Sequence, residues 1–123
     1  MDRVEGAGMN LAAGALAAHA VGLQVAAHNV ANVSTADFRP QVATYATGPN
    51  GVGVALQSVR KQEPAMGSLA TAEAGVASPA GVSGTDLARE MTHMAATQRG
   101  FEANAAVIRA TDELTGSLLN LIA

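Results

Sequence analysis

The chain has 123 residues, which is enough for one domain at most. Hydrophobic residues make up 49% of it but aromatic residues only 2%, so it buries little large apolar surface per residue, and we expect a marginal monomer that gains stability on assembly. A net charge of −3 without a long basic run argues against nucleic-acid binding, and the absence of cysteine excludes disulfides and thiolate metal sites.

The first expected element is a helix over residues 7–31. Large side chains recur every seven residues and alternate with alanine, as in one seam of a coiled coil: Met9, Leu16, Leu23 and Val30 with Ala13, Ala20 and Ala27. These alanines should let a partner helix approach closely, whereas Leu11, Val21 and Val25 form a weaker strip. No charged residue occurs from Gly6 to Ala36, so we expect other helices to enclose this one. Interruptions by Asn, Gln and His argue against a membrane span.

A turn, a β-hairpin and a connector are expected next. Asn, Ser, Thr and Asp at 32–40 favour a turn, which Phe38 should anchor against the helices. Alternating residues on either side of Gly48-Pro49-Asn50-Gly51 indicate a hairpin over residues 41–61. Residues 62–84, rich in Ala, Gly, Ser and Pro, are typical of a flexible connector.

The C-terminal third predicts one long helix over residues 85–122, capped by Ser83, Thr85 or Asp86. A first apolar stripe has the spacing of one helix face: Leu87, Met91, Met94, Phe101, Ile108, Leu119 and Ile122. A second stripe lies roughly opposite: Val107, Leu114, Leu118 and Leu121. Either a compact core covers both faces or partner chains cover the second. Because the N-terminal helix supplies one partner only, we assign the second stripe to contacts between subunits.

No residue pattern predicts catalysis or metal binding. His19 and His28 are nine residues apart and so point to opposite sides of one helix, and His93 lacks a ligand set. There is no nucleophile elbow and no cysteine nucleophile. Adjacent Asp112 and Glu113 are typical of a solvated ion cluster. We therefore expect no enzyme activity, no cofactor and no metal.

The N-terminal segment Leu16–Arg39 resembles the N-terminal signature of bacterial flagellar rod and hook proteins. The core of that signature is S/A-x-N-(L/V/I)-A-N-x-x-T-x-G-F-(K/R), and the matching residues are Asn29, Ala31, Asn32, Thr35, Phe38 and Arg39. Asp37 stands where the family usually has glycine. Aspartate tolerates a left-handed backbone better than most residues, so the turn can survive.

The segment from Asp86 to Leu114 resembles the C-terminal signature of the same family, E-M-x-x-(M/L)-I-x-A-Q-R-x-(F/Y)-E-A-N. The matching runs are Glu90-Met91 and Gln98-Arg99-Gly100-Phe101-Glu102-Ala103-Asn104. Ala95 replaces the usual Ile and Thr97 the usual Ala. The two signatures cover about half of the chain, at both ends and in the family's order.

The short middle lacks the large β-domain of hook and distal-rod members, so the chain is most similar to the short proximal-rod type, closest to FlgC. The resemblance implies a non-catalytic rod subunit that polymerises through its terminal helices and transmits torque from the basal ring to the hook. It implies contacts with copies of itself, other rod proteins and basal-body ring or adaptor proteins. It also implies export through the flagellar type III apparatus, without a cleaved signal peptide, to the periplasmic rod.

The expected fold is mainly α, with long N- and C-terminal helices paired as a coiled-coil-like hairpin and a small β-hairpin and flexible connector between them. The expected parts are an N-terminal assembly helix with the signature turn (1–35), a turn with the β-hairpin (36–61), the connector (62–84) and a C-terminal assembly helix (85–123). Assembly contacts are expected at Met9, Leu16, Leu23, Val30, Asn29, Asn32, Thr35, Phe38, Leu87, Met91, Met94, Phe101, Asn104, Val107, Ile108, Leu114, Leu118 and Leu121. The alternative function is a small helical adaptor or export chaperone that binds a partner helix.

Overall fold

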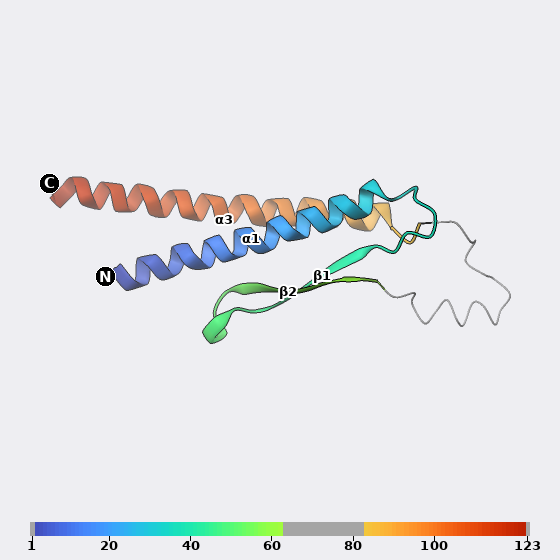
Figure 1. The fold of residues 1–123 in the computed structure, drawn as a ribbon. Coiled ribbons are helices and arrows are strands. Elements are labelled where there is room, and N and C mark those ends of the chain that lie inside the picture. The colour runs from blue at the N-terminus through green and yellow to red at the C-terminus, as the bar shows by residue number, and fades with distance from the viewer. Residues whose placement is uncertain (1, 63–82, 123) are drawn as a thin grey trace.

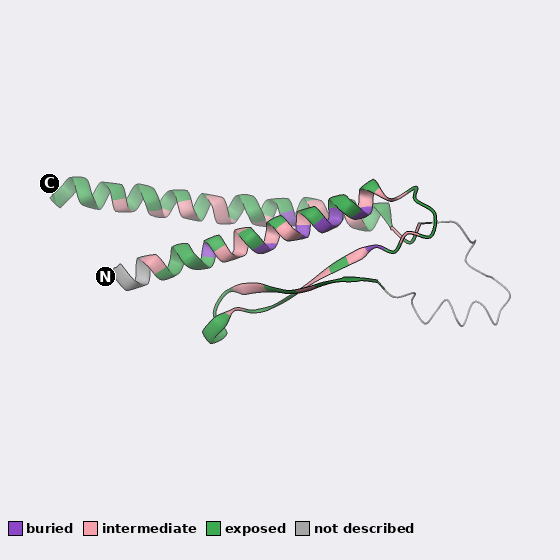
Figure 2. Cartoon of the chain, in the orientation of Figure 1, coloured by how far each residue is buried: buried purple, intermediate pink, exposed green. Residues whose placement is uncertain are grey.

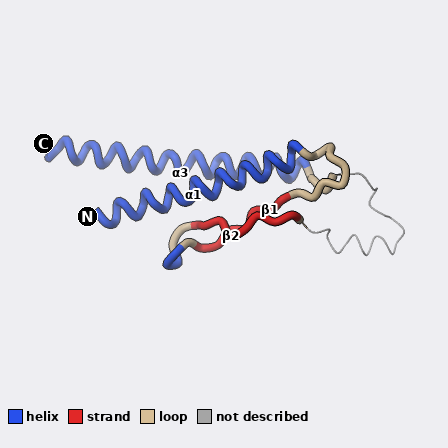
Figure 3. The backbone as a smooth tube through the Cα atoms, viewed as in Figure 1, coloured by secondary structure: helices blue, strands red, loops and turns tan. Residues whose placement is uncertain are grey.

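Two long helices and a β-hairpin form the molecule, with the first helix between the other two elements (Figure 1). The computed structural model describes residues 2–62 and 83–122, and side chains from Gly6 onward. Helix α1 spans Asp2–Ala31 and α3 spans Leu87–Ile122. They run antiparallel and side by side, so both chain ends lie at the same end of the molecule. Strands β1 (Gln41–Thr47) and β2 (Val54–Lys61) lie against α1, as the backbone tube also shows (Figure 3).

The mainly helical fold with a small hairpin is confirmed. The hairpin is a two-stranded antiparallel sheet with a register shift between Thr44 and Tyr45. The predicted turn contains a short 3-10 segment, Pro49–Gly51. At the start of α3, Asp86 is the cap, because its Oδ1 accepts a hydrogen bond from the Arg89 N–H at 3.1 Å. Most of the expected connector, residues 63–82, lies outside the described residues.

The face of α1 that packs within the chain is not the predicted seam. The buried residues of α1 are small, apart from Val25 and Asn29: Ala12, Ala18, Gly22, Val25, Ala26 and Asn29. Met9 is 38% exposed, Leu16, Leu23 and Val30 are half-buried, and the alanines between them are exposed. Within the single chain, the small residues of α1 make its closest contacts, and the residues of the seven-residue repeat do not. The side of α1 that carries the repeat stays partly exposed (Figure 2).

The physical reason is that two elements approach α1 closely at Gly22. A Cβ at this position would lie 2.8 Å from the Tyr45 hydroxyl oxygen of β1 and 3.3 Å from Cγ2 of Thr97 of α3. The Tyr45 hydroxyl also donates a hydrogen bond to the Ala18 carbonyl oxygen at 3.2 Å. Larger side chains at this position would push the hairpin and α3 away from α1. The hairpin and α3 therefore pack on the face of α1 that carries small residues.

Helix α3 turns a mixed polar and apolar face to α1. Thr97 is buried, and Met94, Asn104 and Ile108 are half-buried. The expectation that α1 covers the first stripe is therefore right only for its middle. The other members of that stripe are exposed: Leu87, Met91, Phe101, Leu119 and Ile122. Leu87, Leu119 and Ile122 lie near the ends of α3. Phe101 lies seven residues from Met94 and from Ile108, on the same side of the helix, and is 36% exposed.

Candidate assembly site

The signature turn is tied to the last turn of α1 by its own polar side chains. The Asn32 amide Nδ2 donates to the His28 carbonyl oxygen at 2.9 Å. The Thr35 hydroxyl donates to Asn32 Oδ1 at 3.1 Å, and the Thr35 N–H donates to the Asn32 carbonyl oxygen at 3.0 Å. Asn32 and Thr35 thus satisfy backbone and side-chain groups at the end of the helix.

Phe38 anchors this turn, as predicted. Its ring meets the His28 ring edge-on, with centroids 5.5 Å apart. Its carbonyl oxygen accepts a hydrogen bond from the Gly84 N–H at 2.9 Å, which joins the turn to the segment before α3. Asp37 has a φ of 55°, so the residue that replaces the usual glycine does adopt the left-handed backbone.

Asn29 joins α1, β1 and α3 in one buried junction. Its side chain is 0% exposed. Its Oδ1 accepts a hydrogen bond from the Gln41 N–H at 2.7 Å, and its Nδ2 donates to the Gln41 carbonyl oxygen at 2.8 Å and to Glu90 Oε1 at 3.0 Å. Because Asn29 has no exposed surface in the single chain, the structure places it inside the subunit, where it fixes the relative position of three elements.

The C-terminal half of α3 is mostly exposed (Figure 2), and it carries several large apolar side chains. Leu114 is 66% exposed and Leu121 is 88% exposed. The remaining large exposed residues of this half are Val107, Leu118, Leu119 and Ile122. Both predicted stripes therefore contribute to this surface, which no element within residues 2–62 and 83–122 covers.

The other expected contact residues fall into two groups. Residues exposed on the surface are Met9, Thr35, Leu87, Met91 and Phe101. Half-buried residues are Leu16, Leu23, Val30, Asn32, Phe38, Met94, Asn104 and Ile108. The structure thus brings the signature-turn residues together at one end of the molecule, near Leu87 and Met91, and leaves the large residues of the C-terminal half of α3 at the other.

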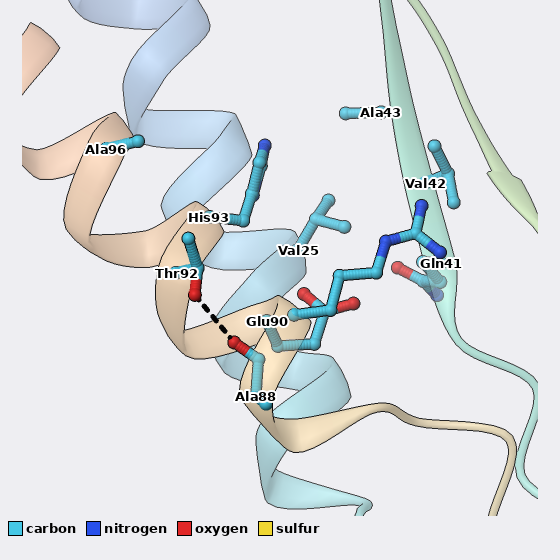
Figure 4. Close-up of a pocket in the computed structure, with 10 residues that line it drawn as sticks. Val25, Gln41, Val42, Ala43, Ala88, Glu90, Thr92, His93 and Ala96 are labelled. Atoms are coloured by element: carbon cyan, nitrogen blue, oxygen red, sulfur yellow. Dashed lines mark hydrogen bonds between the residues drawn. The ribbon is translucent and has the colours of Figure 1, made fainter.

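A groove of about 590 Å³ lies between β1 and α3 (Figure 4). Gln41, Val42 and Ala43 form one wall, and α3 residues from Ala88 to Ala96 form the other. Val25 of α1 lies between the two walls. The lining is mostly apolar and small, with polar groups from α3 at its border.

The titratable side chains near the helix contact have structural partners. A Cβ at Gly100 would lie 2.6 Å from Cε1 of His19, so that ring packs directly on α3. Burial raises the pKa of the Tyr45 phenol above its ordinary value. Over residues 2–62 and 83–122, no group of three or more His, Asp or Glu side chains is placed to hold a metal ion.

A family model described as the C-terminal part of the flagellar basal body rod FlgEFG proteins matches residues 82–121. The match covers 40 of the 123 residues and shows that this stretch is similar to the C-terminal part of flagellar basal body rod proteins. The matched stretch contains nearly all of α3, including the exposed Leu114 to Leu121 surface. Rod proteins are structural components of the flagellar basal body, which agrees with the expected non-catalytic role. Comparison with curated proteins gives no match.

One described segment, Gly6–Ala31, is long and apolar enough to cross a membrane by length and composition alone. A core helix of a soluble protein passes the same test. In this structure, one side of the segment packs on α3 and on the hairpin.

Sequence reasoning missed the partners that make Asn29 a junction, Gln41 and Glu90. They lie 12 and 61 residues away from Asn29, and no local pattern connects them. The available signal is weaker: an asparagine in a helix without charged residues needs hydrogen-bond partners if it is buried. Gly22 was likewise passed over, although a glycine inside a helix indicates a close approach.

Proposed function

We propose that the chain is a structural subunit of the proximal rod, of the short type closest to FlgC, and that it polymerises through its terminal helices. In this role it transmits torque from the basal ring to the hook. The observation that supports the proposal is the exposed apolar surface on the C-terminal half of α3. No described element of the chain covers it, although it includes leucines that are more than half exposed.

The energy available from this surface is large relative to the stability of a small domain. Complete burial of a leucine side chain contributes about 1.5–3 kcal/mol. Leu114, Leu118 and Leu121 are exposed by 66%, 52% and 88%. Burying them against neighbouring subunits would contribute roughly 3–6 kcal/mol per subunit on the same scale. The assembled state would then be much more stable than the free chain.

A second surface for neighbouring subunits lies on α1. Met9, Leu16, Leu23 and Val30 are exposed or half-buried there, and the alanines of the same seam are exposed. An alanine-rich seam allows close approach of another helix. We infer that this seam meets a helix of a neighbouring subunit, while Asn29, Asn32 and Phe38 keep each subunit in shape.

The proposal includes further partners in the basal body. They are other rod proteins, the ring or adaptor proteins that hold the rod, and the flagellar type III export apparatus that delivers subunits to the periplasmic rod without a cleaved signal peptide. The resemblance at both chain ends supports these partners, and the family match at residues 82–121 supports their basal-body location.

Sedimentation velocity of the purified chain at rising concentration tests the assembly surface. We expect open-ended growth of the wild-type chain and a loss of that growth in the double variant Leu118→Gln/Leu121→Gln. Asn120→Gln is the matched control, because Asn120 is exposed at the same end of α3 but on another side. A defined small oligomer would favour the adaptor or chaperone function. Unchanged growth of the double variant would rule out the leucine surface.

A further inference from the structure

The outer edge of β1 is closed at Gln41 and open at Ala43. The Gln62 N–H donates to the Pro40 carbonyl oxygen at 2.7 Å, so Pro40 is hydrogen-bonded across the sheet. Bonded residues alternate along an antiparallel strand, and the N–H and C=O groups of Gln41 and Ala43 therefore point away from β2. Asn29 takes both groups of Gln41. In the described part of the chain, no element beyond β2 bonds those of Ala43.

The groove beside this edge has the size and lining for an extended segment. An added strand places alternate side chains on the helix side of the sheet, and that is where the groove lies (Figure 4). Its lining by Val25, Val42, Ala43, Ala88 and Ala96 suits side chains of the size of valine. Large aromatic side chains are not needed to fill such an alanine-lined space.

The charged side chains that line the groove are Arg89 and Glu90, and two further basic side chains lie on β2, outside the lining. Arg89 and His93 line it on α3, and Arg60 and Lys61 lie opposite Val42 and Gln41 in the sheet register. Glu90 is the acidic side chain of the lining, and it already accepts a hydrogen bond from Asn29. Because Glu90 is already engaged by Asn29, Arg89 is the charged lining group left to pair with a partner, and it complements an acidic one.

We propose that the edge of β1 at Ala43, with the adjoining groove, binds an extended acidic segment of another polypeptide by strand addition. The partner's backbone pairs with the N–H and C=O of Ala43. A small apolar side chain enters the groove, and a neighbouring Asp or Glu meets Arg89. Asn29 limits the site, because its amide occupies the edge at Gln41 and stops a strand from continuing past it. This site is separate from the leucine surface of α3.

A titration of the full chain with a defined peptide tests the site. The probe is acetyl-Glu-Val-Thr-Val-Asp-amide, followed by the Ala43 amide signal in ¹H–¹⁵N NMR spectra. We expect a saturable shift and at least fivefold weaker binding of the peptide in which lysine replaces both acidic residues. We also expect fast hydrogen exchange at Ala43 before the peptide is added. No saturable shift, or an Ala43 amide already protected from exchange, would overturn the proposal.

Two proline variants make the test specific. Ala43→Pro removes the outward N–H of β1 without removing a bond to β2, and we expect it to abolish peptide binding. Val59→Pro is the matched control, since Val59 lies directly opposite Ala43 and its N–H points to the other edge of the hairpin. Arg89→Gln, which leaves the backbone intact, should reduce the preference for the acidic peptide. Equal binding by the Ala43→Pro and Val59→Pro variants would show that the β1 edge is not the site.

Discussion

Replacing Asn29 by alanine should be the most damaging single side-chain deletion within the subunit. The change removes three hydrogen bonds and leaves the Gln41 N–H, the Gln41 carbonyl and the Glu90 carboxylate without this partner. A polar group left unsatisfied costs about 1–3 kcal/mol, and the half-buried Gln41 belongs at the lower end, so we expect a loss of about 3 kcal/mol in the free energy of unfolding. The free energy of unfolding of a domain of this length is roughly 6–18 kcal/mol, so the expected loss is a large part of it.

Urea denaturation followed by circular dichroism at 222 nm measures this loss, with sucrose present if unfolding begins without urea. Asn32→Ala is the matched control, because Asn32 lies three residues away and its local bonds are partly exposed to solvent. We expect that variant to lose less than about 1 kcal/mol. Asn29→Asp keeps the size but lacks the two donors and brings a second carboxylate to Glu90, so it should be no better than alanine.

Hydrogen exchange gives a second measurement for Asn29. The Gln41 amide should exchange much faster in the Asn29→Ala variant than in the wild-type chain, because Asn29 Oδ1 is its acceptor. Equal unfolding free energies for the Asn29→Ala and Asn32→Ala variants, together with unchanged exchange at Gln41, would refute the reasoning that a buried junction holds the three elements together.

Three further predictions concern packing and assembly. Gly22→Ala places a Cβ 2.8 Å from the Tyr45 hydroxyl oxygen and should cost about 1–3 kcal/mol, measured by the same denaturation; an unchanged midpoint would contradict the close approach. The free chain should be loosely helical at low concentration, so a cooperative melt above about 60 °C, beyond most mesophile domains, would contradict a marginal monomer. Removal of residues 118–123 should abolish motility but leave export, and normal swimming of such cells would contradict the role of the leucine surface.

The sequence predicted the elements well because each has a local signal. The turn at Gly48–Gly51, the helix cap at Asp86 and the left-handed Asp37 all follow from the preferences of single residues. The packing face of α1 was not predicted, since a count of large side chains favours Met9, Leu16 and Leu23. The contact of α1 with α3 and the hairpin is made by small residues, because they let these elements approach closely. A pattern of large hydrophobic residues does not indicate such a contact.

Unlike the packing face of α1, the candidate assembly surface on α3 could be predicted from the hydrophobic pattern. Two apolar stripes on one helix require two partners, and in the described part of the chain only α1 packs along α3. The structure leaves even more of these side chains uncovered than the pattern indicated, because α1 meets the mixed face of Met94, Thr97 and Ile108. The Asn29 junction could not be predicted in the same way, since its bonds depend on how distant segments meet.

The distribution of polar and apolar residues on α3 links the marginal monomer to assembly. Thr97 and Asn104 lie where the two helices meet, whereas Leu114, Leu118 and Leu121 lie where no described part of the chain covers them. Apolar burial is the main favourable term in both folding and association. The smaller part of the apolar surface of α3 is buried within the single chain and stabilises it. The larger part is left for burial against neighbouring chains. By mass action, the order of the subunit then rises with the concentration of its partners. In the proposed role, such a subunit would complete its folding where it is incorporated, which is the behaviour that a growing rod requires.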